Sequence, residues 1–156
     1  MATAILALDQ IFPYANIVAG VLVLVVAFGF HFLGQLYSVL NWERATELGL
    51  QEQGAPPEYQ VYEHAIAVSD SLIGWTYGVA AIGLLADSAW GYVWAWLPAV
   101  ALTYHSLGFW FWTRNQKRAG HTFPTTTRPF RQAWFLANLT TGLLTISVAA
   151  SQITVP

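Results

Sequence analysis

The most constraining feature of this chain is an unbroken apolar stretch from Ile17 to Phe30, inside one of four long apolar segments. A bilayer with a hydrocarbon core of about 30 Å requires about 20 helical residues to cross it, and all four segments reach that length. The four segments run from about Tyr14 to Val39, Tyr62 to Ala86, Trp90 to Thr113 and Phe130 to Val155. The sequence therefore predicts four transmembrane helices.

Composition supports the same class of protein. Only 9% of the 156 residues are charged and 56% are hydrophobic, whereas soluble domains carry roughly 25% charged residues. Disordered chains are polar and charged, so disorder is excluded as well. Transmembrane strands are about 10 residues long and alternate apolar with polar residues, unlike these segments. We predict an all-α integral membrane protein.

The positions of the basic residues predict the orientation of the helices. Five of the six basic residues flank the connection between the third and fourth segments, and the sixth, Arg44, follows the first segment. Because Lys and Arg in short loops stay on the cytoplasmic side, loops 40–61 and 114–129 are predicted to be cytoplasmic. Both termini and the short turn at Asp87 and Ser88 then lie on the opposite side. The expected architecture is one domain, residues 1–156, forming an up-down-up-down four-helix bundle.

Two local signals refine these segments. Residues Asn41 to Gln53 contain no proline and precede Gly54, which predicts a helical extension of the first segment ended by that glycine. Asp87 and Ser88 have side chains suited to an N-cap, so we expect them to begin the third helix.

Several function classes are disfavoured. A net charge of −2 gives no basic surface for nucleic acid. The absence of cysteine removes disulfides, thiolate metal sites and covalent c-type haem. The glycines form neither a phosphate-binding loop nor a dinucleotide fingerprint, and no serine lies in a nucleophile elbow. The chain is thus expected to be a multi-pass protein of a membrane that the sequence does not identify.

The candidate site is a layer of polar residues inside the predicted helices. His31, Asp70, His105 and Asn138 each lie 7 or 8 residues from the predicted cytoplasmic end of their segment. At a rise of 1.5 Å per residue, this corresponds to a common depth of about 12 Å. Helical spacing puts each of them on a face rich in small or polar residues, which is typical of a bundle interior. Ionisable groups inside a membrane are costly and are functional candidates by default.

The leading functional hypothesis is binding of a lipid-like apolar molecule in an intramembrane pocket, with acid-base chemistry such as isomerisation, cyclisation or hydration. A carboxylate beside imidazoles can exchange a proton near neutral pH. Asp70 would be the main acid or base, and His31 and His105 its relays. Five further residues are candidates for ligand binding: Gln35, Tyr77, Tyr104, Trp134 and Asn138.

Four alternatives remain open. The polar layer could serve only helix packing through interhelical hydrogen bonds. His31 and His105 could bind the two faces of a b-type haem, or join Asp70 in holding zinc or non-haem iron. The layer could also line a transport or proton pathway. Finally, the chain could be an accessory subunit of a larger membrane complex or a homo-oligomer. The leading hypothesis requires no cofactor, and its expected partners are membrane lipid and the apolar ligand.

Overall fold

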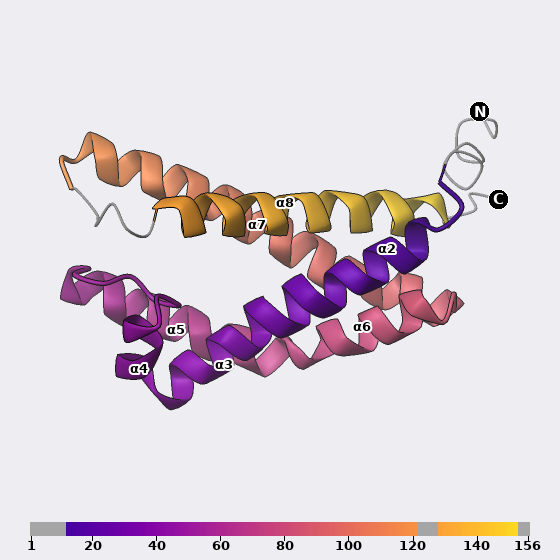
Figure 1. The fold of residues 1–156 in the computed structure, drawn as a ribbon, viewed down its shortest axis with the longest axis horizontal. Coiled ribbons are helices and arrows are strands. Elements are labelled where there is room, and N and C mark those ends of the chain that lie inside the picture. The colour runs from indigo at the N-terminus through magenta and orange to yellow at the C-terminus, as the bar shows by residue number, and fades with distance from the viewer. Residues whose placement is uncertain (1–11, 122–127, 153–156) are drawn as a thin grey trace.

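The computed structural model describes residues 12–121 and 128–152, and helices account for all regular secondary structure within these ranges (Figure 1). The first helices are α2 (Ala15–Leu22), the π-helix η1 (Val23–Phe32), α3 (Leu33–Leu40) and α4 (Trp42–Glu47). They are followed by α5 (Pro57–Ile73), α6 (Trp75–Leu85), α7 (Ala89–Arg118) and α8 (Arg128–Ser151). The described chain is therefore all-helical, as the sequence predicts.

The first predicted segment is one uninterrupted helical column, because α2, η1 and α3 follow one another without a break from Ala15 to Leu40. Its middle third, Val23–Phe32, has π-helical geometry. Such wide turns are rare and occur frequently at functional sites, since they change the direction in which side chains point. His31 lies in the last turn of this π-helical stretch.

The second predicted segment is bent. Helices α5 and α6 meet at Gly74 with an angle of 44° between them. A Cβ atom at Gly74 would lie 2.5 Å from the Phe32 ring and 2.7 Å from the Asp70 carbonyl oxygen. The glycine at this bend therefore lets Phe32 of η1 approach the α5 backbone one turn after Asp70.

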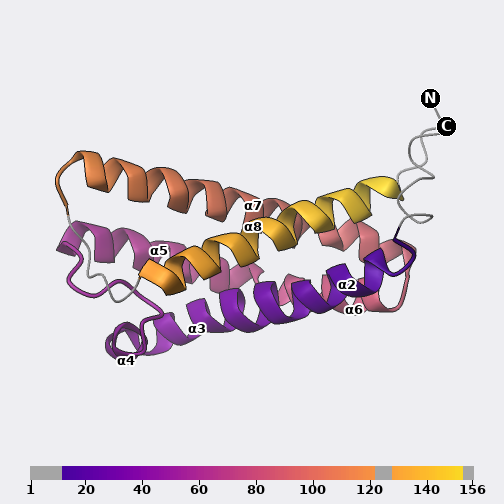
Figure 2. The same ribbon diagram turned by 45° about the horizontal axis from the view of Figure 1, so that its top comes forward.

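A tight turn connects α6 to α7, as the sequence predicts. Ser88 is the N-cap of α7, and its hydroxyl accepts a hydrogen bond from the Gly91 amide at 3.3 Å. Beside this turn, a Cβ at Gly91 would lie 2.2 Å from the carbonyl carbon of Gly83. Two glycines thus let the α6 and α7 backbones touch, which makes these helices antiparallel neighbours (Figure 2).

The predicted extension of the first helix is wrong. The helix ends at Leu40, and Asn41 adopts φ −153° and ψ 81°, outside the helical region. The Asn41 side chain accepts a hydrogen bond from the Arg44 amide and so caps the separate short helix α4. After α4 the chain turns back, with Gly49 at φ +76°. Asparagine is a favoured N-cap because its short side chain reaches the free amides of the next turn, and here this preference outweighs helix continuation.

Two helical stretches among the described residues are long and apolar enough to cross a membrane, Ala15–Leu40 and Gln132–Ser151. The bent α5–α6 pair is a third if its two helices form one span. Helix α7 has 30 residues but is rich in Trp and Tyr and ends in a polar, basic turn. Aromatic residues of this kind favour the membrane interface over its centre. The chain has the character of a helical membrane protein, and the crossing of α7 stays a prediction.

The apolar core lies where α2, α6, α7 and α8 come together. Its buried residues are mostly small, including Ala19, Ala80, Ala95 and Ala149, with Tyr77 among the largest. Toward the other end of the molecule, α3 and α5 lie on one side and α7 and α8 on the other, and the two pairs diverge (Figure 1). The candidate site lies in this diverging part.

Candidate functional site

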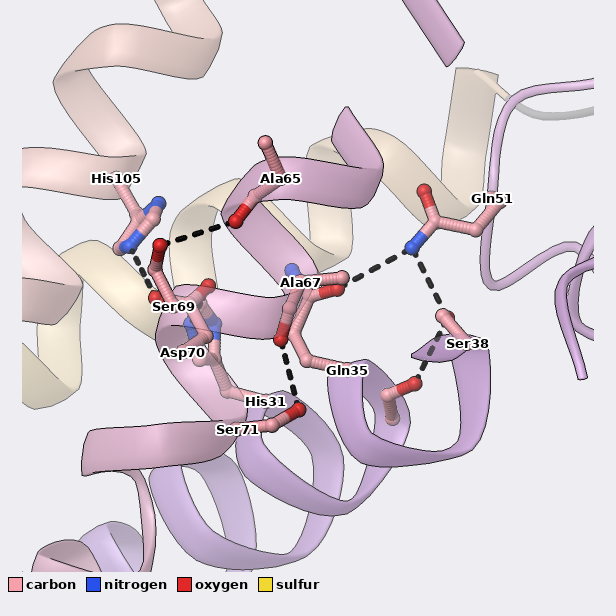
Figure 3. Close-up of polar contacts among 11 residues, drawn as sticks. His31, Gln35, Ser38, Gln51, Ala65, Ala67, Ser69, Asp70, Ser71 and His105 are labelled. Atoms are coloured by element: carbon pink, nitrogen blue, oxygen red, sulfur yellow. Dashed lines mark hydrogen bonds and ion pairs between the residues drawn. The ribbon is translucent and has the colours of Figure 1, made fainter. Parts of the chain in front are cut away.

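Asp70 joins two histidines that come from different helices. One carboxylate oxygen of Asp70 lies 3.2 Å from Nε2 of His31, and the other lies 3.2 Å from Nε2 of His105. His31 belongs to η1, Asp70 to α5 and His105 to α7, so the centre is built from three columns (Figure 3). The imidazole ring centroids are 4.8 Å apart. The structure therefore brings together the three residues that the sequence analysis selected as an acid-base centre.

The centre is almost completely removed from the surface of the chain. The side chains of His31 and Asp70 are 1% and 5% exposed, whereas that of His105 is 21% exposed. A buried ionised carboxylate is unfavourable unless hydrogen-bond donors compensate it. Each of the two imidazoles supplies that compensation if it donates its Nε2–H to one oxygen of Asp70. The Nδ1 atom of each ring is then an acceptor. His105 is consequently the member that a molecule outside the centre contacts most easily.

A cavity of about 660 Å³ adjoins this centre. Its walls come from η1, α3, α5, α7 and α8 and from the loop after α4. The polar and aromatic residues that line it are Phe30, His31, Gln35, Gln51, Glu52, Tyr59, Tyr62, Glu63, Ser69, Asp70, Tyr104, His105, Phe109, Trp112, Trp134 and Asn138. This volume falls within the range of about 300–1,000 Å³ typical of small-molecule sites.

The other predicted binding residues take different positions. Gln35, Tyr104, Trp134 and Asn138 line the cavity. The Trp134 ring stacks on His31 with centroids 6.1 Å apart, and Asn138 donates from Nδ2 to the Trp134 carbonyl oxygen at 2.7 Å. Tyr77 is fully buried beside His31, at 6.3 Å between ring centroids, and is not among the residues that line the cavity.

The loop that follows α4 contributes a wall that the sequence analysis did not anticipate. Gln51 is buried and donates to the Gln35 side chain at 3.2 Å and to the Ser38 hydroxyl at 3.0 Å (Figure 3). These bonds bring the loop back against α3, where Glu52 also lines the cavity. No periodic signal marks such a return, because it depends on contacts between residues far apart along the chain.

Glu63 and Tyr59 are also lining residues that the sequence analysis did not select. The Tyr59 hydroxyl lies beside the Glu63 side chain, and the Tyr59 ring packs against Trp112 of α7 at 4.7 Å between centroids. Here a sequence signal existed. Glu63 precedes Asp70 by seven residues, a spacing that returns a helical side chain to the same face. Helix α5 thus presents two carboxylates to one cavity.

The same centre has the donor set of a metal site. One ligand atom from each of His31, Asp70 and His105 lies within 4.8 Å of the other two. Two imidazoles and a carboxylate suit zinc or non-haem iron. A haem between the two imidazoles is less compatible, because both rings already meet at one carboxylate and their centroids are only 4.8 Å apart.

The comparisons with known proteins gave no relative for this chain. No family model, no curated protein and no solved structure matches it.

Proposed function

We propose that the cavity binds a lipid-like apolar molecule and that Asp70, His31 and His105 transfer protons to and from it. The observation that carries this proposal is the buried Asp70 carboxylate, which is paired with two imidazoles at the wall of a 660 Å³ cavity. A polar centre serving only helix packing needs neither an ionisable group nor an adjoining cavity, since serine, threonine or asparagine cross-link helices at lower desolvation cost.

The exposure of the three side chains supports a different role for each of them in this proposal. His105 contacts the ligand, because it is the most exposed of the three. The Asp70 carboxylate stabilises the proton that His105 takes up from the ligand. His31 stabilises the same carboxylate by a hydrogen bond to the other oxygen of Asp70. In an isomerisation, a proton would leave one carbon of the ligand, pass through His105 and return to another carbon, with no net consumption. Asn138 and Tyr104, both at the cavity wall, would orient a ligand oxygen.

The binding half of the proposal is tested by filling the cavity. Ala137 lines the cavity, whereas its neighbour Leu136 does not and is 58% exposed. We expect Ala137→Trp to exclude the ligand and Leu136→Trp to retain it. The measurement is mass spectrometry of organic extracts from the purified wild type and both variants. A molecule enriched in the wild type and in Leu136→Trp alone supports binding, and equal extracts from all three contradict it.

The chemical half is tested by solvent deuterium. If the centre exchanges protons with the ligand, the molecule extracted after incubation in D₂O should gain mass with the wild type and not with Asp70→Asn. Asparagine preserves the shape of the side chain and removes only its basicity. Retained exchange in a folded Asp70→Asn protein would overturn the catalytic role of the carboxylate.

A second candidate function, a mononuclear metal centre, is favoured by the spacing of the ligand atoms. One ligand atom from each of His31, Asp70 and His105 lies within 4.8 Å of the other two, and two imidazoles with a carboxylate suit zinc or non-haem iron. Elemental analysis of the purified protein tests this candidate. One equivalent of zinc or iron, lost in both His31→Ala and His105→Ala, would favour the metal centre over acid-base catalysis.

Haem is tested by the visible spectrum of the purified protein before and after dithionite. A Soret band that shifts on reduction would establish haem, with His31 and His105 as its ligands. The proposed acid-base centre predicts only aromatic absorption in the near ultraviolet.

We also propose that α7 crosses the membrane, which gives four spans with loops 40–61 and 114–129 in the cytoplasm. Because the natural sequence has no cysteine, single introduced cysteines report accessibility without background. A membrane-impermeant maleimide should label Ser88→Cys from outside intact cells and Asn115→Cys only after permeabilisation. The same labelling pattern for both sites would contradict four spans.

A further inference from the structure

The charged side chains in the described lining of the cavity are acidic, apart from the two histidines. Three carboxylates line the cavity, from Glu52, Glu63 and Asp70, and its lining contains no lysine or arginine among the described residues. Asp70 is paired with the two imidazoles, and Glu63 is half-buried and lies beside the Tyr59 hydroxyl. An anionic group entering this cavity would meet these carboxylates and no lysine or arginine of the described lining.

The second property of the wall is its aromatic content. Seven lining residues are aromatic: Phe30, Tyr59, Tyr62, Tyr104, Phe109, Trp112 and Trp134. The faces of such rings attract cations, most strongly where water is excluded, and cages of aromatic rings recognise quaternary ammonium groups. Carboxylates and aromatic rings on one wall are therefore complementary to an organic cation.

An independent observation concerns Asn138. Its side chain lines the cavity and is 1% exposed, and its Oδ1 atom has no hydrogen-bond partner. A buried carbonyl oxygen without a partner is unfavourable, and a ligand N–H would satisfy it. The unpaired Asn138 oxygen is thus an acceptor, which favours the positive end of a ligand over an anionic group.

We infer that the ligand of this cavity is a phosphate-free amphiphilic amine or quaternary ammonium compound, recognised by Glu63 and the surrounding aromatic rings. The inference rests on the proposed function, because it names the class of molecule that the cavity binds. Glu63 and Asp70 are seven residues apart on α5, which separates them by about 10 Å along the helix. A ligand whose cationic group lies at Glu63 can therefore place an apolar part beside His105 and Asp70.

The test uses three water-soluble probes with the same hexyl chain: hexyltrimethylammonium, hexanol and hexanoate. Each is titrated by calorimetry into the purified full-length protein in an uncharged maltoside detergent. We expect saturable binding of hexyltrimethylammonium, at least tenfold tighter than that of either other probe. Equal binding of hexanol would overturn the cation inference and leave the apolar pocket of the proposed function intact. Preferred binding of hexanoate would also overturn the inference, and no saturable binding of any probe would overturn both proposals.

Matched variants test the recognising residue. Glu63→Gln keeps an acceptor for Tyr59 and removes the charge, so hexyltrimethylammonium affinity should fall about tenfold. Glu58→Gln is the control, because Glu58 lies on the same helix, is exposed and does not line the cavity. Equal affinities in the two variants would contradict the assignment, and Glu52→Gln provides a second lining variant if Glu63→Gln does not fold.

A lipid headgroup could supply the same cation, so a fourth probe distinguishes the two sources. Dihexanoylphosphatidylcholine carries a trimethylammonium group next to a phosphate. We expect it to compete with bound hexyltrimethylammonium in the same calorimetric titration, with an affinity at least tenfold weaker than that of hexyltrimethylammonium, because its phosphate would face the carboxylates. Equal or better displacement would overturn the choice of a phosphate-free cation.

Discussion

Glycine plays opposite roles in the two halves of this molecule. In the half built from α2, α6, α7 and the end of α8, glycines are points of helix contact. A Cβ at Gly20 would lie 2.9 Å from the Leu85 side chain, and one at Gly142 would lie 2.4 Å from the Thr103 hydroxyl. In the half built from α3, α5 and the ends of α7 and α8 nearest them, Gly34 and Gly108 line the cavity and a Cβ there would meet nothing within 4 Å.

The difference shows that small residues alone do not determine close packing in a membrane bundle. Gly83 and Gly91 face one another directly across the α6–α7 turn, so the two backbones meet. Where a glycine faces a divergent neighbour, as Gly108 does, the missing side chain instead adds to a cavity. One half is closed by backbone contact, and the other remains open around a polar centre that cross-links three columns.

The largest expected effect comes from removing a partner of the buried carboxylate. His31→Ala leaves one Asp70 oxygen without its donor in a buried site, and breaking such a pair costs about 3–5 kcal/mol. We expect a large fall in the melting temperature in detergent, or loss of the folded protein. His64→Ala is the control, because His64 is exposed and packs only on Trp42 in the described ring contacts. If both variants melt like the wild type, the centre does not hold the open half together.

The second effect tests the closed half. In Gly91→Ala the new methyl group would lie 2.2 Å from a backbone carbon of Gly83, which a side-chain rotation cannot relieve. Overpacking of this kind costs about 1–3 kcal/mol, equivalent to a fall of roughly 2–12 °C in melting temperature for a chain of this size. Thermal unfolding followed by tryptophan fluorescence gives this value. An unchanged melting temperature would mean that α6 and α7 are not in backbone contact.

The sequence predicted the parts of the fold that depend on local rules. The observed helix bounds lie within a few residues of the predicted ones, except that α5 begins five residues before the predicted Tyr62 and α7 ends five residues after Thr113. The predicted end of the fourth segment, Val155, lies outside the described residues. The Ser88 cap is also confirmed. These features depend on hydrophobic length and on the affinity of a serine hydroxyl for free amides, which neighbouring residues largely determine.

Features that depend on distant contacts were not predictable in this way. The bend at Gly74 depends on Phe32, which lies on another column. Gln51 reaches Gln35 and Ser38 only because Asn41 ends the first helix and turns the chain back. Equal depth along four segments identified His31, Asp70 and His105 as candidates, but depth alone does not specify which carboxylate oxygen each imidazole contacts.

The smallest expected effect separates the two roles of glycine most sharply. Gly108→Ala adds a methyl group that meets nothing within 4 Å, and alanine is favoured over glycine in a helix by about 0.8–1.0 kcal/mol. We therefore expect an unchanged or slightly higher melting temperature, with a rise of up to about 4 °C. The same substitution would then lower stability at Gly91 and not at Gly108, although both glycines lie in α7. Equal destabilisation at both positions would mean that α7 is packed along its whole length, with no room for the cavity.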